Sequence, residues 1–403
     1  MRNNIKFIVV SLGLILQAVS AVGQLAVQGE TVYTMAGEPI KNGVVLIKNG
    51  KIDAVGAGLA IPATYKIVKS KVVTPGLVDA HSVVGLAGIL NYSQDQDQLE
   101  LSDAIQPELR AVDSYNARED LVKWLRDFGI TTVHTGHGPG ALASGQTMVV
   151  KTTGNTVSQS LVQSPTMVAF TLGAAVGQNY RKPGTRAKGV SMLRDEFLKA
   201  QDYAKKMQAK DATKRPARDL KMDILNDVLA GKVSALFTAH RATDIQAALR
   251  LQKEFGFKLV LDGASEAYLV LDELKKANVP VIIHPTMMRA VGDGINASME
   301  TAAVLRRAGI TVALQSGYEG YVPKTRVVLF EAAVAAAHGL SFEDALRTIT
   351  IDAAKIIGVS KEVGSLEKGK DADVVCFDGD PFEYTSHVCT VIINGEIVKE
   401  TCK

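Results

Sequence analysis

The middle of the chain alternates short apolar runs with amphipathic stretches, and this alternation constrains the fold more than any other feature. Between two of the runs, Ile245, Ala248 and Leu249 follow helical spacing, and Gly256 ends the stretch. Strands that alternate with helices are typical of a parallel sheet with crossover helices. The apolar runs predict eight strands, which end near His81, His134, Lys151, Gly173, His240, Gly263, His284 and Gly317. Eight such units predict an α/β fold, a (β/α)8 TIM-like barrel with its active site at the C-terminal strand ends.

The two ends of the chain have a different character. Near the N-terminus, Asn42-Gly43 and Asn49-Gly50 separate runs rich in valine and isoleucine, and Asn-Gly pairs are strong hairpin signals. The C-terminal part repeats this pattern in a hairpin over residues 391–398. We therefore predict one small β-sandwich that both ends build together. The predicted parts are residues 24–73 with 364–403 for the sandwich and residues 74–363 for the barrel.

The first residues have the composition of an export signal. Arg2 and Lys6 accompany an apolar run over residues 7–22 that is too short to span a bilayer comfortably. Ala21-Val22-Gly23 then offers small residues for cleavage. We predict a signal peptide over residues 1–23 and an exported, periplasmic protein without a membrane anchor; an uncleaved anchor is the alternative. The 3 cysteines lie near the C-terminus without CxxC spacing, so one local disulfide is compatible with an oxidising compartment.

One stretch places a metal-competent side chain at the end of a strand. The apolar run over residues 72–78 bends at Pro75-Gly76 and ends on Asp79 and His81. A zinc hydrolase built this way normally has a second imidazole two residues later, because a period of two returns both rings to one face of the strand. That position is Val83 here.

Histidines follow several other predicted strands. A single histidine is more often a hydrogen-bonded or surface ring than a functional one, but rings that converge on one face of a barrel favour a functional pocket. The histidines at or just beyond strand ends are His81, His134, His137, His240 and His284.

At this point the sequence resembles a known family. The stretch from Thr74 to His81 is similar to the first-strand motif of the amidohydrolase superfamily, and Gly129 to Val133 resembles the second strand. The stretch from His240 to Ile245 resembles imidazolonepropionase-related members, and Gly364 to Asp373 resembles the return into the sandwich. The resemblance covers nearly the whole chain. It implies a metal-dependent hydrolase with a (β/α)8 barrel and a composite sandwich.

The sequence departs from the family at three ligand positions. Val83 stands where the resemblance implies a histidine on strand one, Gly263 where it implies one on strand six, and Gly317 where it implies the strand-eight aspartate. Of the expected set, only His81 and His240 remain. Two imidazoles would hold a catalytic zinc weakly, since such a site usually has three protein ligands and a water.

Other residues offer replacements. A relocated site for a divalent metal, zinc first, combines His81 and His240 with His137 and His284. Hydrolysis also needs a base near the water, for which Asp79 and Asp262 are candidates, although Asp79 is equally suited to capping its loop. Candidate substrate-binding residues are His134, Arg241 and Lys151, the last being either a carboxylated bridging lysine or an ordinary strand cap.

These observations leave two principal functions open. The first is a hydrolase acting on carbon–nitrogen bonds, non-peptide or in small amides, with a reduced or relocated metal site. The second is a catalytically inactive barrel that binds a small molecule or pairs with an intact paralogue. Metal-free acid–base chemistry by Asp79 and the histidines is a third. The expected partner is a small-molecule substrate and not nucleic acid, because the net charge is only +3. Exposed hairpins are compatible with a homodimer or a heteromer with a related amidohydrolase.

Overall fold

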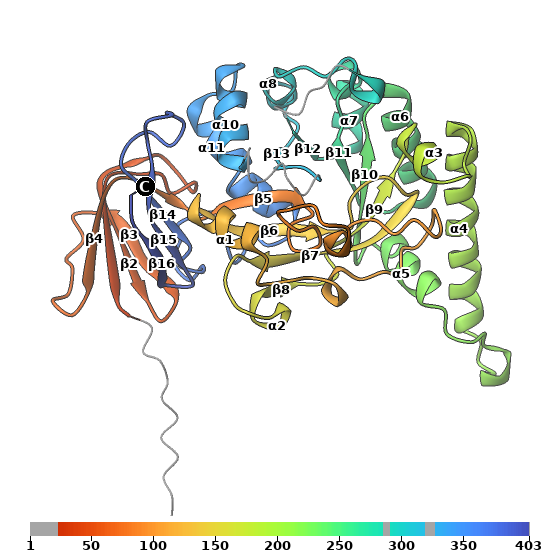
Figure 1. Cartoon of the computed structure of the whole chain (residues 1–403), viewed down its shortest axis with the longest axis horizontal. Coiled ribbons are helices and arrows are strands. Elements are labelled where there is room, and N and C mark those ends of the chain that lie inside the picture. Colours follow the sequence, from red (N-terminus) through yellow and green to blue (C-terminus); the bar gives the residue numbers. More distant parts are fainter. Residues whose placement is uncertain (1–22, 285–290, 319–326, 403) are drawn as a thin grey trace, which may run out of the picture.

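The computed structural model describes residues 23–284, 291–318 and 327–402. Apart from Gly23, the predicted signal peptide lies outside the described residues. The described chain has two parts side by side, a curled sheet built from both chain ends and a larger barrel with helices around it (Figure 1). A barrel with a composite sandwich confirms the fold class predicted from the sequence.

The sandwich is built from one continuous sheet that curls around its own core. Its strand order is β16-β15-β14-β4-β1-β2-β3, so a strand from near the N-terminus, β4, joins the two chain ends. β4 pairs with β1 in parallel and with β14 in antiparallel orientation. The strands are β1 (Leu25–Val32), β2 (Ile40–Lys48), β3 (Lys51–Ala57), β4 (Lys66–Pro75), β14 (Val374–Phe377), β15 (Val388–Ile393) and β16 (Glu396–Glu400). Cys389 and Cys402 form a disulfide that ties the end of the chain to β15.

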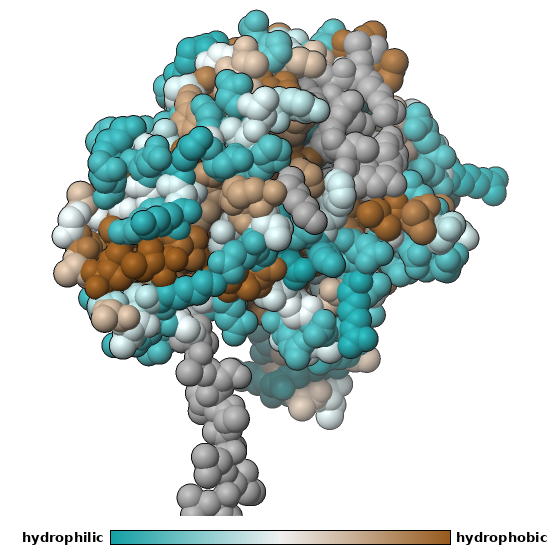
Figure 2. All heavy atoms as spheres, turned by 60° about the vertical axis from the view of Figure 1, so that its left-hand side comes forward, coloured by the Kyte–Doolittle hydropathy of each residue, from teal (hydrophilic) through white to brown (hydrophobic). Residues whose placement is uncertain are grey.

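The sandwich has apolar side chains on both faces. Val27, Ile47 and Val374 belong to the core between the curled strands. A second apolar group on the same sheet is centred on Val44 and Leu46. Seen from the sandwich side, the molecule shows a compact hydrophobic patch among hydrophilic residues (Figure 2).

Eight strands form the barrel, in the order β13-β12-β11-β10-β9-β7-β6-β5. A parallel bridge between Ser82 and Gly317 brings the two edges of this sheet together. The strands are β5 (Leu77–Ser82), β6 (Ile130–Gly136), β7 (Ala143–Lys151), β9 (Met167–Thr171), β10 (Ser234–Ala239), β11 (Leu259–Gly263), β12 (Val281–Ile283) and β13 (Val312–Leu314). Each lies within a few residues of a strand end predicted from the apolar runs.

One strand runs against the others, which the alternation pattern does not predict. β7 is antiparallel to both of its neighbours, β6 and β9. The turn from Gly136 to Ala143 has no crossover helix, so β6 and β7 form an antiparallel hairpin in the barrel wall. The outer edge of β7 also carries the short strand β8 (Leu161–Gln163). The predicted all-parallel sheet is therefore wrong for this one strand.

Helices cover the outside of the barrel (Figure 1). α6 ends at Gly256 with a left-handed φ of 78°, as its sequence predicts, and Thr185 caps the N-terminus of the longest helix, α4. The helices are α1 (Asp120–Asp127), α2 (Val157–Ser160), α3 (Ala175–Asn179), α4 (Arg186–Met207), α5 (Leu220–Leu229), α6 (Ala242–Phe255), α7 (Leu271–Ala277), α8 (Thr301–Arg307), α10 (Val328–Ala337), α11 (Phe342–Thr348) and α12 (Ile351–Ile356). Within the described ranges, every helix is too short or too polar to cross a membrane.

A long excursion follows the first barrel strand and packs beside the barrel mouth. It contains only two short 3-10 turns, Ser93–Asp95 and Ala111–Asp113. Its later part runs along the first residues of β7, where Arg110 forms an isolated parallel β-bridge with Gln146. Its earlier part is held by the backbone N–H of Gly138, which donates to the Gln98 carbonyl at 2.9 Å. The excursion therefore lies beside the part of β7 that extends beyond the end of β6.

Candidate active site at the barrel mouth

A buried carboxylate is the centre of the polar site at the barrel mouth. Asp262, near the end of β11, accepts hydrogen bonds from Thr238 Oγ1 at 2.6 Å and Gln315 Nε2 at 2.7 Å. It also accepts one from the Tyr318 hydroxyl, and His81 Nδ1 lies 3.3 Å from its Oδ1. These partners come from β10, from the segment after β13 and from β5, so Asp262 joins both edges of the barrel sheet.

The surroundings keep the Asp262 carboxylate charged. Burial alone would raise the pKa of Asp262, but the nearby His81 and the hydroxyl donors Thr238 and Tyr318 hold it below its usual value. Burial beside this carboxylate raises the pKa of Tyr318 well above its usual range, so Tyr318 stays a protonated donor. The site is therefore a fixed negative charge surrounded by donors.

His81 also belongs to this group and, like Gln315 Oε1, has hydrogen-bonding capacity left over among the described residues. Its side chain is fully buried, and neither ring nitrogen has a hydrogen-bond partner among the described residues. The ring centre lies 5.1 Å from that of Tyr318 and 5.5 Å from that of His134. A buried polar atom without a partner is costly in a structural role, which points to a ligand or water at this position.

His134 differs from His81 although the two rings are neighbours. Its Nδ1 lies 2.7 Å from the Ala80 carbonyl and its Nε2 lies 2.6 Å from Thr147 Oγ1. Burial and the neighbouring His81 lower the pKa of His134 to about 3, so the ring is neutral and donates from Nδ1 to the carbonyl. Both nitrogens are committed inside the barrel wall. The sequence predicts that His134 binds substrate. In the structure it connects β6 to β5 and β7 through these two hydrogen bonds.

Asp79 joins the two edges of the barrel. It accepts from the backbone N–H of Ser316 at 3.1 Å, from the Ser316 hydroxyl, and from the His81 N–H at 3.4 Å. Burial raises the pKa of Asp79 to about 6, although these donors and the nearby His284 counteract the rise. This arrangement corresponds to the capping role considered from the sequence, since Asp79 holds the segment after β13 against β5.

His240 occupies space that a side chain at position 263 would need. A Cβ on Gly263 would lie 2.6 Å from His240 Cε1, and Gly263 has a φ of +72° that favours glycine. His240 Nδ1 is 2.8 Å from the Ser265 hydroxyl, while burial lowers the pKa of the ring. The neighbouring Arg241 lies 3.3 Å from Glu266. The glycine at the expected ligand position therefore accommodates the remaining histidine.

The other sequence-predicted residues have partners outside the His81–Asp262 pair or lie elsewhere on the barrel. His284 Nε2 lies 3.1 Å from Glu331, a buried residue of α10. His137 follows β6 and lines a cavity on the flank of the barrel. Lys151 lies at the opposite end of the barrel, because β7 runs antiparallel, and pairs with Asp373 at 2.5 Å and with Asp371 at 3.0 Å. This geometry matches the strand-cap alternative for Lys151, and its substrate-binding role stays a prediction.

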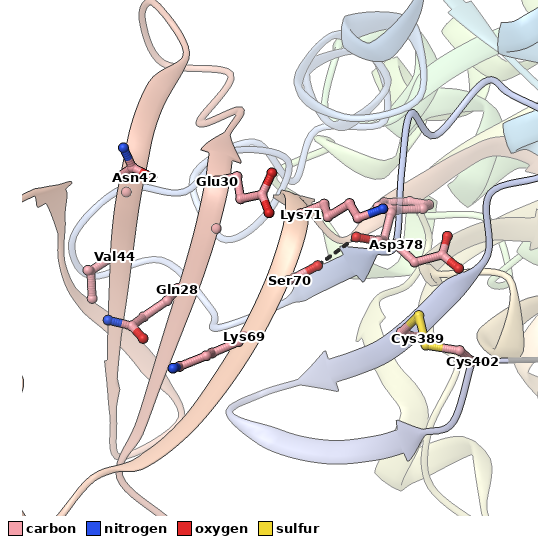
Figure 3. A pocket seen from close by; sticks show the side chains of 13 residues that line it. Gln28, Glu30, Asn42, Val44, Lys69, Ser70, Lys71, Asp378, Cys389 and Cys402 are labelled. Atoms are coloured by element: carbon pink, nitrogen blue, oxygen red, sulfur yellow. Dashed lines mark hydrogen bonds between the residues drawn. A yellow bond between two sulfur atoms is a disulfide. The ribbon is translucent and has the colours of Figure 1, made fainter.

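The described residues do not assemble the four-histidine metal site expected from the sequence. Across residues 23–284, 291–318 and 327–402, one group of three histidine, cysteine or acidic side chains has its ligand atoms within 4.8 Å of one another. That group is Asp378, Cys389 and Cys402, which line a hollow on the sandwich (Figure 3), and its two sulfurs are bonded to each other. Among the described residues, no three histidine, cysteine or acidic ligand atoms at the mouth lie within 4.8 Å of one another.

Sequence reasoning missed the donors that surround Asp262 and Asp79. Gln315, Ser316 and Tyr318 lie in the stretch matched to strand eight, around Gly317. From the sequence alone, only the missing aspartate there has an assigned meaning. A signal was present, since three polar side chains directly follow the apolar run of β13. Thr238 and Glu331 have no comparable signal, because only the fold brings them to the mouth.

A barrel with a composite sandwich and a histidine–carboxylate pair at its mouth defines the class of amidohydrolase-like barrels, and comparison with known proteins specifies the family. A solved amidohydrolase from Thermotoga maritima MSB8 is 32% identical, with a TM-score of 0.87, over 93% of this chain and 100% of that one. Residues 285–398 match the model of the amidohydrolase family. The chain belongs to the amidohydrolase superfamily, as its motifs indicate.

Curated relatives are more distant. An imidazolonepropionase from Fusobacterium nucleatum is 25% identical over 94% of this chain and 97% of that protein. An imidazolonepropionase from Caldanaerobacter subterraneus is also 25% identical, over 88% of this chain. The amidohydrolase tasK of Hapsidospora irregularis is 23% identical over 88% of this chain, but the match covers only 39% of that protein.

Proposed function

We propose that this protein is a hydrolase that cleaves a carbon–nitrogen bond, non-peptide or in a small amide, of a small-molecule substrate. One observation carries the proposal: His81 is buried at the barrel mouth without a ring hydrogen bond among the described residues, and a charged carboxylate lies 3.3 Å from its Nδ1. The similar proteins support this reaction class, since they include imidazolonepropionases and an amidohydrolase matched over nearly their whole length.

The chemistry follows from the pairing of His81 with Asp262. A carboxylate beside Nδ1 orients an imidazole and stabilises its protonated form, which leaves Nε2 to take a proton from an attacking water. Thr238, Gln315 and Tyr318 hold the carboxylate in place. In this proposal His81 is the general base and Asp262 the residue that positions it. Asp79 keeps the barrel edges together.

The metal site is reduced in this proposal. Superfamily members are typically metal-dependent, and His81 and His240 are the residues that would hold a divalent ion, zinc first. Such an ion would polarise a bound water or carbonyl when present. Because no three described ligand atoms at the mouth lie within 4.8 Å of one another, each step above is assigned to side chains alone. His137 and His284 are left out of the ligand set, since they do not converge on His81 and His240 within the described residues.

The central test removes the unpartnered imidazole. His81→Gln should lower kcat by about 10²–10⁴-fold on any small amide, cyclic amide or N-acyl substrate that the protein hydrolyses, the usual contribution of a general base. His387→Gln is the matched control, since His387 is half-exposed on the sandwich and pairs with Asp378. Hydrolysis that survives His81→Gln at the wild-type rate would refute the assignment.

Metal analysis separates the two forms of the reaction. Activity in protein without stoichiometric zinc, nickel or manganese would support the His81–Asp262 pair acting alone. Stoichiometric metal that His240→Ala removes, together with activity, would instead show that the reduced metal site is the working form.

A second candidate function is an inactive barrel that binds a small molecule or pairs with an intact paralogue. The saturation of Asp262 by its donors and the filling of the Gly263 position by His240 favour it, because both leave little room for a metal. Purification from the native host decides it. An intact amidohydrolase that co-purifies in stoichiometric amount would support the pairing, and a catalytically active homo-oligomer would exclude it.

We also propose that the protein is exported to the periplasm after cleavage near Gly23. The Cys389–Cys402 disulfide supports export, since disulfides persist in oxidising compartments. N-terminal sequencing of the protein from its host tests this, and a retained Met1 in a cytosolic fraction would contradict it.

A further inference from the structure

A cavity of about 830 Å³ lies on the flank of the barrel, separate from the barrel mouth. It is open to solvent and lies between the excursion after β5 and α5, with β7 behind it. We call it the flank cavity. Its volume lies within the range of small-molecule sites. The lining residues that carry the argument are Gln96, Asp97, Glu100, Glu108 and His137.

The flank cavity has more negative than positive charge. Each basic residue that lines it already has an acidic partner, Arg110 with Asp113 at 2.8 Å and Arg218 with Asp223 at 2.7 Å. A third lining acid, Asp227, pairs with Lys232. Among the described residues, the three other lining acids have no ion-pair partner; they are Asp97, Glu100 and Glu108. The cavity therefore favours a cation.

Buried polar atoms in the same cavity lack partners. His137 is only 5% exposed, and neither of its ring nitrogens has a hydrogen-bond partner within the described ranges. The same holds for Glu108 Oε2 and Gln96 Nε2. Buried polar atoms are almost always satisfied, so a cavity lined by residues that carry several unsatisfied ones is suited to hold water or a ligand.

The backbone keeps His137 in this position. A Cβ on Gly145 would lie 2.4 Å from His137 Cδ2, and Gly145 adopts a φ of +139° that other residues avoid. Burial lowers the pKa of His137 to about 4, so at neutral pH the ring adds no positive charge and one of its nitrogens can accept a hydrogen bond. The ring is thus a fixed polar group at the inner wall.

The barrel wall and the excursion separate this cavity from the mouth. Gly138, next to His137, hydrogen-bonds to Gln98 of the excursion and lies close to Val83 and Tyr318, which belong to the mouth. The flank cavity and the His81–Asp262 pair therefore lie on opposite sides of this contact.

We propose that the flank cavity binds a small organic cation that carries an amine or guanidinium group. Its N–H groups would donate to Glu108 and to the His137 acceptor nitrogen, and its charge would balance the unpaired acids. A bare metal ion fits less well, because within the described residues no three ligand atoms of these side chains lie within 4.8 Å of one another. The acceptors instead suit a group that spans several ångströms.

The test compares n-butylguanidine with n-butylurea, which has nearly the same shape but no charge, by isothermal titration calorimetry on the full mature protein. We expect saturable binding of the guanidine and at least tenfold weaker binding of the urea, a difference of about 1.4 kcal/mol. Glu108→Gln and His137→Asn should each weaken guanidine binding by about tenfold. Asp195→Asn, which removes an exposed acid of α4, is the matched control and should leave binding unchanged.

Several outcomes would overturn the proposal: equal affinity for the urea, no binding at millimolar guanidine, or Zn²⁺ or Ca²⁺ binding that Glu108→Gln abolishes. NMR of histidine-labelled wild-type protein gives a readout without mutation, since guanidine should shift the His137 resonances. His81→Gln should bind the guanidine as wild type does, so a failure of the proposed hydrolase activity and a failure of this site are distinguishable.

Discussion

The two ends of the barrel contain buried charged groups that are arranged in opposite ways. At the base, Lys151 is only 4% exposed and lies within 3.0 Å of both Asp371 and Asp373, which the sandwich contributes. At the mouth, Asp262 is equally well supplied with donors, but the neighbouring His81 forms no ring hydrogen bond among the described residues, although its Nδ1 lies 3.3 Å from Asp262 Oδ1. Fully paired charged groups therefore mark the end of the barrel that stabilises the fold. Side chains with unused hydrogen-bonding capacity mark the end that is available for chemistry.

The most direct test of this difference removes the Lys151 cation at the lower end of the barrel. Lys151→Met should lower the free energy of unfolding by about 3–5 kcal/mol, because it leaves the buried Asp373 carboxylate without its cation, while Asp371 keeps only the exposed Lys51. Urea denaturation measures the loss, and kcat on a working substrate should stay at the wild-type value. Lys206→Met is the matched control, since its exposed pair with Asp202 should contribute about 0–1 kcal/mol. A large drop in kcat for folded Lys151→Met would show that this lower end of the barrel contributes to catalysis.

Acidification should weaken the mouth through His134. Its folded pKa, about 3, lies below the unfolded value of 6.5, so this stability is present above pH 6.5 and is lost as the pH falls toward the folded pKa. His134 alone should remove about 2 kcal/mol between pH 6.5 and 4.5. Urea denaturation of wild type and His134→Gln at both pH values measures this. Parallel losses in the two proteins would show that His134 does not titrate on unfolding.

Asp79 should have the opposite pH dependence and a smaller effect. Its folded pKa, about 6, lies above the unfolded value of 3.8, so its contribution is present below pH 3.8 and is lost as the pH rises through 6. Asp79→Asn keeps the shape and avoids burying a charge. It should be about 1–2 kcal/mol more stable than wild type at pH 8, with a smaller gain at pH 4.5. A variant that is less stable at pH 8 and inactive would restore Asp79 to a catalytic role.

Much of the architecture could be predicted from local sequence. The apolar runs indicate all eight barrel strands, because a strand buried on both faces must be apolar along its length. The Asn-Gly pairs and Gly256 indicate turns and a helix end, since these depend on the backbone of a few residues. Pro75-Gly76 likewise marks the change from sandwich to barrel, where a Cβ on Gly76 would collide with Thr131.

The chemistry of each polar side chain depends on neighbours that are distant in sequence. His81, His134 and His137 look alike in the sequence, yet one pairs with Asp262, one is bound on both sides within the wall, and one faces the flank cavity. The direction of β7 is likewise a tertiary fact, because an apolar run reads the same whether its strand is parallel or antiparallel. The sequence by itself determined the family, the barrel and the residue types at its mouth. Only the tertiary structure decided which nitrogens are satisfied and which end of the barrel Lys151 reaches, because burial and pairing are set by residues that the chain brings together from more than 200 positions away.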